Sequence, residues 1–299
     1  MTTTLRADIK SAIVEAKPHL GQGSIATYAS LLNSLAKQLK IESLDDYKKI
    51  SEKDVLDYVD GMTNMSSQKT LLSAVLIIKR TEGFQKRMLE YAEKVNAQYN
   101  KQTIGENRKD SYITFQEVKD RFAGLESRLK ASPTPANYVD HLVYRLMSGI
   151  YYSPRRLEWA DVKVRNYDKA IDNYLEKDTV TFNKYKTRKS YGVQTLKLDK
   201  PTMGVIRKWL KMNDTDYLLT TKTGKKMSSS ALSTRIGDIL NDTRFGVDIF
   251  RSIYLTDLYS GVLPPLEQLQ RIAKEMGHSL EMQMQYRKID APTTSAAKK

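Results

Sequence analysis

The sequence predicts a mainly α-helical protein with a small antiparallel β-sheet, built as an N-terminal helical bundle followed by a mixed α+β domain. Three observations predict this fold class. Apolar residues recur at helical spacing through most of the 299-residue chain. Alternating, β-branched stretches are confined to 179–182 and 193–198. The polar stretch 101–112 loses the helical period, contains a glycine and is typical of a linker between domains.

Residues 1–100 predict a compact domain of four short helices without strands. Apolar side chains follow helical spacing over 25–39, over 67–78 and around 88–95. A further helix is expected to begin at Ser51, a residue type favoured at the N-cap. Four amphipathic helices of this length bury their apolar faces against one another, which predicts a bundle.

Residues 113–291 predict the second domain. Thr114 and Glu117 have the spacing of a capping box, so a helix is expected to begin there. Further helices are predicted on both sides of the strand pair, and the last covers roughly 280–289. Residues 292–299 are predicted to form a disordered tail.

The composition limits the possible functions. The chain has 49 Lys and Arg against 35 Asp and Glu, a net charge of +14. Such a surplus favours nucleic acid or an acidic membrane surface, and a basic protein without such a partner is the alternative. Cysteine is absent, which excludes disulfides and thiolate chemistry. Three scattered histidines predict no metal site, and no apolar run approaches the roughly 20 residues that span a bilayer. We therefore expect an intracellular, soluble protein without metal.

Basic residues are concentrated between 177 and 235, where 14 Lys and Arg stand against four Asp and Glu. A solvated basic face is the simpler explanation of such a stretch. Here, however, the surplus covers a predicted hairpin turn and two predicted helix starts. That distribution favours a groove that contacts phosphates.

Cleavage of a phosphodiester without a metal needs a nucleophile, cations around phosphorus and an acid for the leaving oxygen. Arginine suits the second role, because its planar fork bonds two phosphate oxygens and keeps its charge. Four segments of the second domain supply such residues in order. They are the turn with Arg155 and Glu158, the basic turn with Lys186, the helix start with Arg251, and Gly277-His278-Ser279 followed by Tyr286. Alone, the first segment is more simply a surface ion pair and the second a solubilising turn, whereas Arg251 stands in an apolar stretch that does not favour a solvated side chain.

Together, these four segments resemble the tyrosine recombinases. Arg155 and Glu158 match the family's Arg-x-x-Glu motif, and Lys186, followed by threonine, matches its hairpin lysine. Arg251 matches the arginine that closes the family's His-x-x-Arg motif. The Gly-His-Ser motif and the tyrosine that follows it are matched at 277–279 and at position 286. The motifs cover residues 114–290, and the first domain resembles the family by architecture only. Within that family, the Pro-Arg-Arg segment at Arg155 and the Tyr-Lys-Thr segment at Lys186 most resemble those of integrases from eukaryotic viruses and mobile elements.

The resemblance implies a role for each residue. Arg155 and Arg251 clamp the scissile phosphate, and His278 donates a further hydrogen bond to it. Lys186 protonates the departing 5′ oxygen, and Tyr286 attacks phosphorus to form a 3′-phosphotyrosine. The phosphotyrosyl bond keeps the energy of the broken phosphodiester, so no cofactor is expected.

The resemblance also implies partners. Residues 1–100 become a core-binding domain and residues 113–291 the catalytic domain. Double-stranded DNA is the expected partner, held by a homotetramer on paired sites. Side chains of six basic residues are expected to contact it: Arg156, Lys184, Arg188, Lys189, Lys225 and Lys226.

One position departs from the family's pattern. Where the family usually has a histidine three residues before its second arginine, this chain has Asp248. A carboxylate cannot replace a cationic donor to phosphate, so the proton acceptor for Tyr286 stays open. Either Asp248 is itself the base, or the position is dispensable.

The leading hypothesis is therefore a site-specific recombinase or integrase, and two alternatives stay open. A type IB topoisomerase uses a similar set of Arg, Lys, His and Tyr, and would relax supercoils without strand transfer. A catalytically inactive relative would bind DNA and fail to cleave a nicked substrate.

Overall fold

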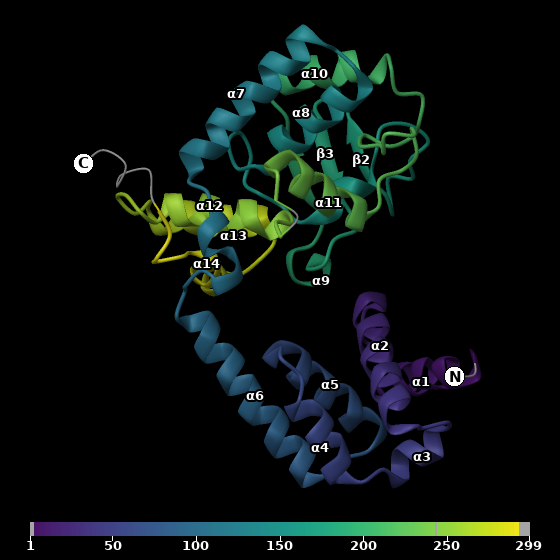
Figure 1. Ribbon diagram of the computed structural model, residues 1–299. Helices are drawn as coiled ribbons and strands as arrows, with labels where there is room; N and C mark the ends of the chain where they lie inside the picture. Colours follow the sequence, from purple (N-terminus) through teal and green to yellow (C-terminus); the bar gives the residue numbers. More distant parts are fainter. Residues whose placement is uncertain (1–2, 243, 293–299) are drawn as a thin grey trace. The chain divides into compact units, whose positions relative to one another are not determined.

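A computed structural model describes residues 3–242 and 244–292 of the chain (Figure 1). The chain separates into two compact units that divide between Lys101 and Gln102. Of the predicted disordered tail, residues 293–299 lie outside the described part. Among the residues described, no helix combines the length and the apolar character needed to cross a membrane.

The first unit is entirely helical in its described residues. Its helices are α1 (Thr3–Ala16), α2 (Gln22–Leu39), α3 (Leu44–Lys49), α4 (Glu52–Asp60), α5 (Met65–Ile78) and α6 (Glu82–Asn100). The sequence predicted α2, α4, α5 and α6. It missed α1, whose buried face has only Leu5, Ile9 and Ile13, and α3, which is too short to show a period. A capping box between Ser43 and Asp46 starts α3 instead.

The second unit is also mainly helical. Before the sheet it contains the 3-10 helix η1 (Glu106–Ser111), α7 (Phe115–Ala131), α8 (Pro135–Met147) and the 3-10 helix η2 (Leu157–Asp161). Within and after the sheet follow α9 (Arg188–Tyr191), α10 (Lys200–Leu210), α11 (Ser229–Leu240), α12 (Val247–Leu258), α13 (Leu266–Met276) and α14 (Leu280–Tyr286). The segment that the sequence predicted as a linker contains η1, and Ile104 and Tyr112 beside it belong to the core of this unit.

A four-stranded sheet lies within the second unit, in the order β1-β2-β3-β4. The strands are β1 (Val162–Lys163), β2 (Asn173–Glu176), β3 (Thr179–Phe182) and β4 (Gln194–Lys197). β3 and β4 form the antiparallel pair that the sequence predicted. β2 joins them as a further antiparallel strand, while β1 pairs with β2 in parallel, so the sheet is mixed. The predicted class, mainly α with a small sheet, is confirmed.

Helix α8 lies at the centre of the second unit. All its residues from Tyr138 to Met147 are buried, including three that carry polar or charged groups. A helix buried on every side needs partners for these groups. Arg145 donates to the Thr202 hydroxyl at the start of α10, at 2.6 Å. The helix therefore connects its neighbours through polar contacts as well as through packing.

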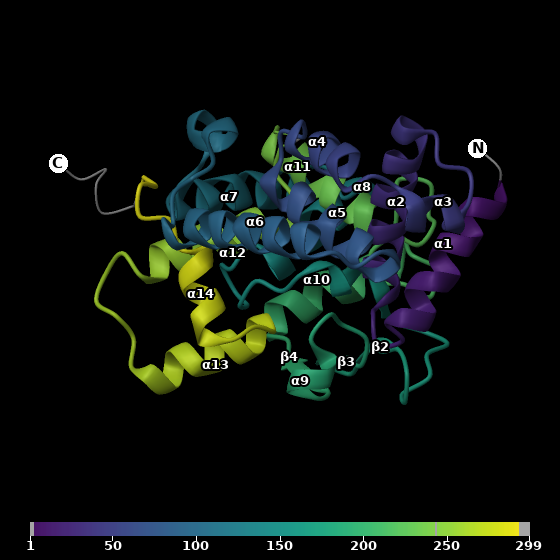
Figure 2. The same ribbon diagram turned by 90° about the horizontal axis from the view of Figure 1, so that it is seen from below.

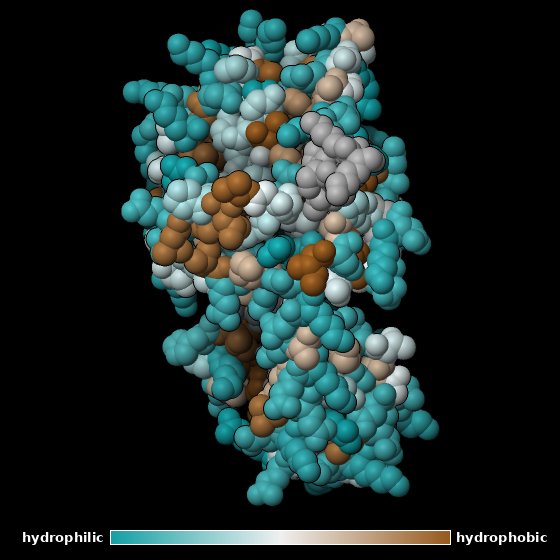
Figure 3. Space-filling view, turned by 90° about the vertical axis from the view of Figure 1, so that its left-hand side faces the viewer, coloured by the Kyte–Doolittle hydropathy of each residue, from teal (hydrophilic) through white to brown (hydrophobic). Residues whose placement is uncertain are grey.

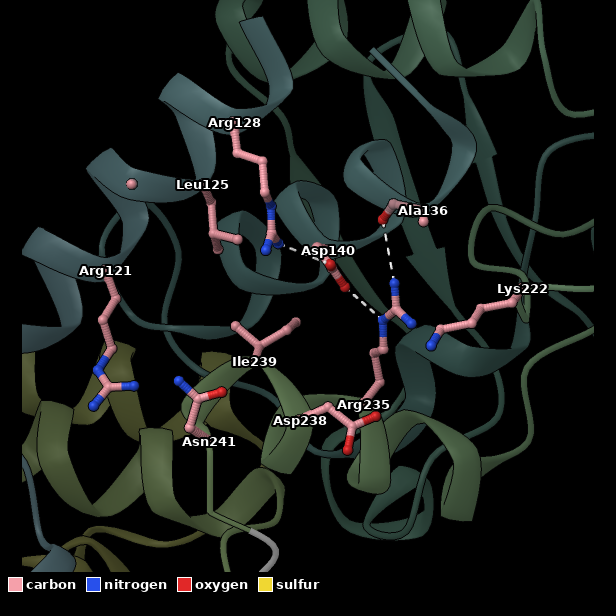
Figure 4. A pocket seen from close by; sticks show the side chains of 11 residues that line it. Arg121, Leu125, Arg128, Ala136, Asp140, Lys222, Arg235, Asp238, Ile239 and Asn241 are labelled. Atoms are coloured by element: carbon pink, nitrogen blue, oxygen red, sulfur yellow. Dashed lines mark hydrogen bonds and ion pairs between the residues drawn. The ribbon is translucent and has the colours of Figure 1, made fainter. Parts of the chain in front are cut away.

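Asp140 of α8 is the most connected of these groups. Its carboxylate accepts hydrogen bonds from Arg128 of α7 and from Arg235 of α11. Figure 4 shows the carboxylate between the two guanidinium groups, in a pocket of about 680 Å³. Burial raises the pKa of Asp140, and the two arginines oppose that rise. One carboxylate thus joins three helices.

Replacing Asp140 with asparagine should destabilise the protein by about 2 to 4 kcal/mol, because Arg235 keeps its charge at a largely buried position and loses its counter-ion. Urea unfolding measures the change. Asp238→Asn is the matched control: this exposed carboxylate lines the same pocket and forms no ion pair in the described structure, so a loss below about 0.5 kcal/mol is expected. Equal losses in the two variants would refute the role of Asp140.

Candidate active site

The candidate site forms around the C-terminal end of α13. This helix ends in a Schellman turn, in which Gly277 adopts φ +69°. The backbone N–H groups of Gly277 and His278 donate to the carbonyls of Lys274 and Ala273, at 3.0 and 3.1 Å. The carbonyls of residues 275–277 receive no bond from this turn. They are left for donors from elsewhere in the chain.

Three arginines supply those donors. Arg155, Arg251 and Arg156 donate to the carbonyl oxygens of residues 275, 276 and 277, at 2.6, 3.2 and 3.0 Å respectively. The end of a helix carries a partial negative charge, which favours cations there. The helix end therefore gathers guanidinium groups from two distant segments. Two of them, Arg155 and Arg251, are the predicted phosphate clamp.

Arg155 lies deep in the protein, with 4% of its surface exposed. Its Nε donates to Glu158 at 3.1 Å, and its guanidinium lies 4.2 Å from the ring of Phe182. Its Nη1 also donates to the side chain of Gln194. Burial lowers the pKa of Arg155, and Glu158 opposes that fall. The Arg155–Glu158 pair is therefore buried, and the simpler explanation of a surface ion pair is wrong.

Arg251 is fully buried near the start of α12. Its guanidinium carbon lies 4.6 Å from the centre of the Tyr286 ring, and its Nε lies 4.0 Å from Asp248 Oδ1. Burial lowers the pKa of Arg251 to about 10, although Tyr286 opposes the fall. At neutral pH this side chain is a buried cation that lacks a close counter-ion.

His278 lies directly after the turn, with 3% of its surface exposed. Its Nδ1 is 2.9 Å from the carbonyl oxygen of Ser279, so Nδ1 must carry the proton that this bond needs. Burial lowers the pKa of His278 to about 4. The ring is therefore neutral at pH 7, with a lone pair on Nε2. It lies 5.6 Å from the ring of Tyr286.

Tyr286 ends α14, a short helix that is firmly anchored. Gln283 in this helix is fully buried, donates to the carbonyl of Leu269 at 3.1 Å and accepts from the Tyr259 hydroxyl at 2.8 Å. The Ser252 hydroxyl of α12 donates to the carbonyl of Tyr286 at 2.8 Å. These bonds fix the backbone that carries the phenol.

Lys186 lies between β3 and β4, beside the short helix α9. Its side chain is exposed and forms no hydrogen bond or ion pair with any described residue. Both neighbours are held: Tyr185 donates to the carbonyl of Gly192 at 2.7 Å, and Thr187 donates to that of Gly277 at 2.8 Å. Figure 2 shows β4 and α9 beside α13. The backbone of Lys186 is thus tied to the turn that precedes His278.

Four buried nitrogens of the site have no hydrogen-bond partner. They are Arg155 Nη2, Arg251 Nε and Nη2, and His278 Nε2, and they make up half of the eight such side-chain atoms among the described residues. Buried polar groups in proteins are nearly always paired, so a cluster of unpaired ones needs an explanation. An anion among them would accept from the arginines and would favour protonation of the histidine.

The predicted DNA-contacting residues fall into two groups. Lys184 and Lys226 form ion pairs with carboxylates, Asp172 at 3.1 Å and Asp161 at 2.6 Å, and Arg156 donates to the turn as described. The side chains of the other three form no hydrogen bond or ion pair in the part of the chain described: Arg188, Lys189 and Lys225.

The sequence did not reveal the residues that hold the site together. Gln194 of β4 donates to the carbonyl of Lys274 at 2.7 Å while its oxygen accepts from Arg155. Thr187 directly follows Lys186 in the lysine motif, yet its side chain donates a hydrogen bond to Gly277, 90 positions later in the chain. No local pattern marks such contacts, because they depend on which turns meet after folding.

Comparison with solved structures finds the same architecture. A crystal structure of a lambda integrase dimer bound to a COC′ core site matches with a TM-score of 0.54 at 14% identity, over 96% of this chain and 77% of that chain. A second, of a fragment of lambda integrase as a dimer on a COC′ core site, matches with a TM-score of 0.53 at 14% identity, over 97% and 96%. The chain has the integrase fold.

The likeness is one of structure. At the level of sequence, no protein-family model and no curated protein matches this chain. The predicted fold is confirmed over nearly the whole chain by its match to lambda integrase. The closer placement among integrases of eukaryotic viruses and mobile elements stays a prediction.

A side chain at position 277 should destabilise the turn that ends α13. Gly277→Ala imposes a left-handed conformation on alanine, at a cost of about 1 kcal/mol, and brings the added Cβ within 3.2 Å of Thr187 Oγ1. Gly224→Ala is the matched control, because Gly224 has φ +72° and open space around the added Cβ. Urea unfolding should show a larger loss for Gly277→Ala. Equal losses of unfolding free energy in the two variants would mean that Thr187 moves away from the added Cβ at no measurable cost.

Proposed function

We propose that this protein is a site-specific DNA recombinase of the integrase type, which cleaves and rejoins strands through a 3′-phosphotyrosine at Tyr286. The observation that carries the proposal is the set of four unpaired buried nitrogens, three of which belong to Arg251 and His278 beside the Tyr286 ring. A phosphodiester brings one negative charge and two non-bridging oxygens that accept hydrogen bonds. Its oxygens could therefore accept hydrogen bonds from the unpaired nitrogens of the arginines.

Binding requires a small rearrangement, because the phenol ring of Tyr286 lies against Arg251 and His278. When the ring moves aside, a phosphate can accept from the arginines. The new anion beside Nε2 favours the imidazolium, so the pKa of His278 rises from about 4. The protonated Nε2 then donates a hydrogen bond to the phosphate, as the arginines do. DNA binding is thereby linked to proton uptake.

The chemical step then follows from the positions of the remaining groups. The oxygen of Tyr286 attacks phosphorus, and the 5′ oxygen leaves with a proton from Lys186. The arginines stabilise the extra negative charge on the pentavalent phosphorus, where preorganised cations are most effective. Rejoining reverses the step with another strand and needs no nucleotide cofactor.

The wider surface supports double-stranded DNA as the partner. The net charge is +14, and Arg188, Lys189 and Lys225 near the site carry no ion pair in the described structure. The lambda integrase structures of the same fold are dimers on a core site. We propose that several copies of this chain, up to a tetramer on paired sites, likewise assemble on DNA inside the cell.

The segment between α12 and α13 supports assembly. Val262, Leu263 and Leu266 are 97%, 58% and 59% exposed, and Figure 3 shows hydrophobic side chains gathered on this face of the second unit. Contiguous exposed apolar groups are typical of surfaces that contact another molecule.

The covalent intermediate gives the decisive test. The purified protein is incubated with duplexes that carry a nick and a randomised sequence around it, and covalent adducts are separated by denaturing electrophoresis and sequenced. The wild-type protein should form adducts at a defined sequence. Tyr286→Phe should form none while it retains DNA binding, because it lacks only the nucleophilic oxygen.

Each other outcome has a distinct meaning. Adducts in Tyr286→Phe would show that another residue is the nucleophile. Binding without adducts in the wild type would support the inactive relative. Relaxation of supercoiled plasmid without transfer between two sites would support a type IB topoisomerase.

The anchoring of α14 predicts cleavage within one subunit. Besides the Ser252 bond, the backbone N–H of Lys288 donates to Thr256 of α12 at 2.9 Å, so Tyr286 is held in its own site. A mixture of Arg251→Ala and Tyr286→Phe proteins should therefore form no more adduct than the two proteins separately. A marked gain on mixing would show that the tyrosine is delivered to a neighbouring subunit.

A further inference from the structure

Asp248 lies where the sequence pattern of the family would place a histidine, and the structure shows what it contacts. The hydroxyl of Tyr286 donates to Asp248 Oδ1 at 3.3 Å. The same carboxylate oxygen lies 4.0 Å from Nε of Arg251. We propose that Asp248 is the proton acceptor of Tyr286 in strand cleavage, an inference that rests on the proposed function of the site.

Asp248 differs from the phosphate donors in its exposure, although its Oδ1 lies only 4.0 Å from Nε of Arg251. A carboxylate beside a bound phosphodiester would repel it, so Asp248 can act only on the side of the nucleophile. Its side chain is 63% exposed and open to water, whereas the donors at Arg155, Arg251 and His278 are buried. Buried donors for the anion and an exposed acceptor for the proton therefore meet at the same phenol.

His278 is the competing acceptor, since Nε2 carries a lone pair in the free protein. No hydrogen bond joins it to Tyr286, whose hydroxyl points to Asp248 instead. A bound phosphate also converts His278 into a donor, as argued above, and an imidazolium cannot take a proton. Asp248 stays available in both states.

The step balances as follows. The proton of the Tyr286 hydroxyl moves to the carboxylate of Asp248 while the phenol oxygen bonds to phosphorus. The bond from phosphorus to the 5′ oxygen breaks, and that oxygen takes its electron pair and a proton from Lys186. In rejoining, the acid form of Asp248 returns the proton to the phenol oxygen. Ordinary phenols and carboxylates differ in pKa by about six, so the proton must move together with bond formation.

Asp248→Asn is the informative variant. Asparagine keeps an oxygen that accepts the hydrogen bond, so the phenol stays in place, but it cannot take a proton. If Asp248 is the proton acceptor, this variant loses that function. If Asp248 only positions the phenol, asparagine takes over that role and reactivity is kept. Asp248→His restores a base with a different pH range. Glu281→Gln is the matched control, since this exposed carboxylate in the first turn of α14 forms no hydrogen bond or ion pair with described residues.

The nucleophile can be tested without knowing the DNA site. Diisopropyl fluorophosphate transfers its phosphoryl group to an activated phenol: the new bond forms from Tyr286 oxygen to phosphorus, fluoride leaves, and the phenol proton goes to the acceptor. Labelling of the Tyr286 peptide is followed by mass spectrometry between pH 5 and pH 8. The exposed Tyr99 of the first unit serves as the internal control in every sample.

The wild type and Glu281→Gln should label Tyr286 at the same rate as each other at every pH, because both keep the carboxylate of Asp248 beside the phenol. Asp248→Asn should react at least about tenfold more slowly. Asp248→His should lose reactivity below about pH 6.5, where imidazole becomes protonated. The other groups that face this site are unchanged in all variants: Arg251 of α12, Arg156 before η2, Glu158 within η2, and His278 before α14.

Labelling of Asp248→Asn at the wild-type rate, with circular dichroism showing a folded protein, would overturn the proposal. The DNA adduct assay on the same proteins separates the two claims. Labelling that depends on Asp248, in a protein that forms no DNA adduct, would keep the acceptor and reject the recombinase. DNA adducts that form at equal rates in the wild type and in Asp248→Asn would keep the recombinase and reject Asp248 as the proton acceptor.

Discussion

The whole site depends on the unsatisfied carbonyl groups at the end of α13. A helix leaves its last carbonyls without partners, and the turn at Gly277 satisfies only those of residues 273 and 274. Arg155, Arg156 and Arg251 bond the next three, and in doing so become fixed in direction. Each guanidinium has five N–H donors, so bonding a carbonyl leaves others to bind a ligand. A structural need of the backbone thus orients the groups that we propose bind the phosphate.

This arrangement places positive charge where burial disfavours it. Arg155 has Glu158 as a close counter-ion, whereas Arg251 has only an exposed carboxylate 4.0 Å away and the face of an aromatic ring. Burial accordingly lowers the pKa of Arg251 and leaves His278 neutral. A bound anion would relieve both effects, so the free protein is prepared for phosphate at some cost to its own stability. The Tyr286 ring covers the donors until a ligand takes its place.

The departure at Asp248 fits this division of charge. Arg251 and His278 lie buried against the Tyr286 ring, whereas Asp248, which accepts from the same phenol, is open to water. The fold shared with lambda integrase does not by itself determine which side chain stands at position 248. In the proposed mechanism, a carboxylate at this position changes the group that removes the proton, while the arginines and His278 keep their places.

The sequence by itself determined the features that repeat locally. Helical spacing predicted most helices, alternation predicted β3 and β4, and short motifs predicted five site residues, because each signal lies within a few neighbouring residues. Tertiary structure decided the rest. The two-residue strand β1 is too short to carry a period, and its parallel pairing with β2 depends on a crossover. The contacts of Asp248 with Tyr286 and of Thr187 with Gly277 join residues 38 and 90 positions apart. Such contacts arise only when packed helices bring their ends together, so no local pattern can predict them.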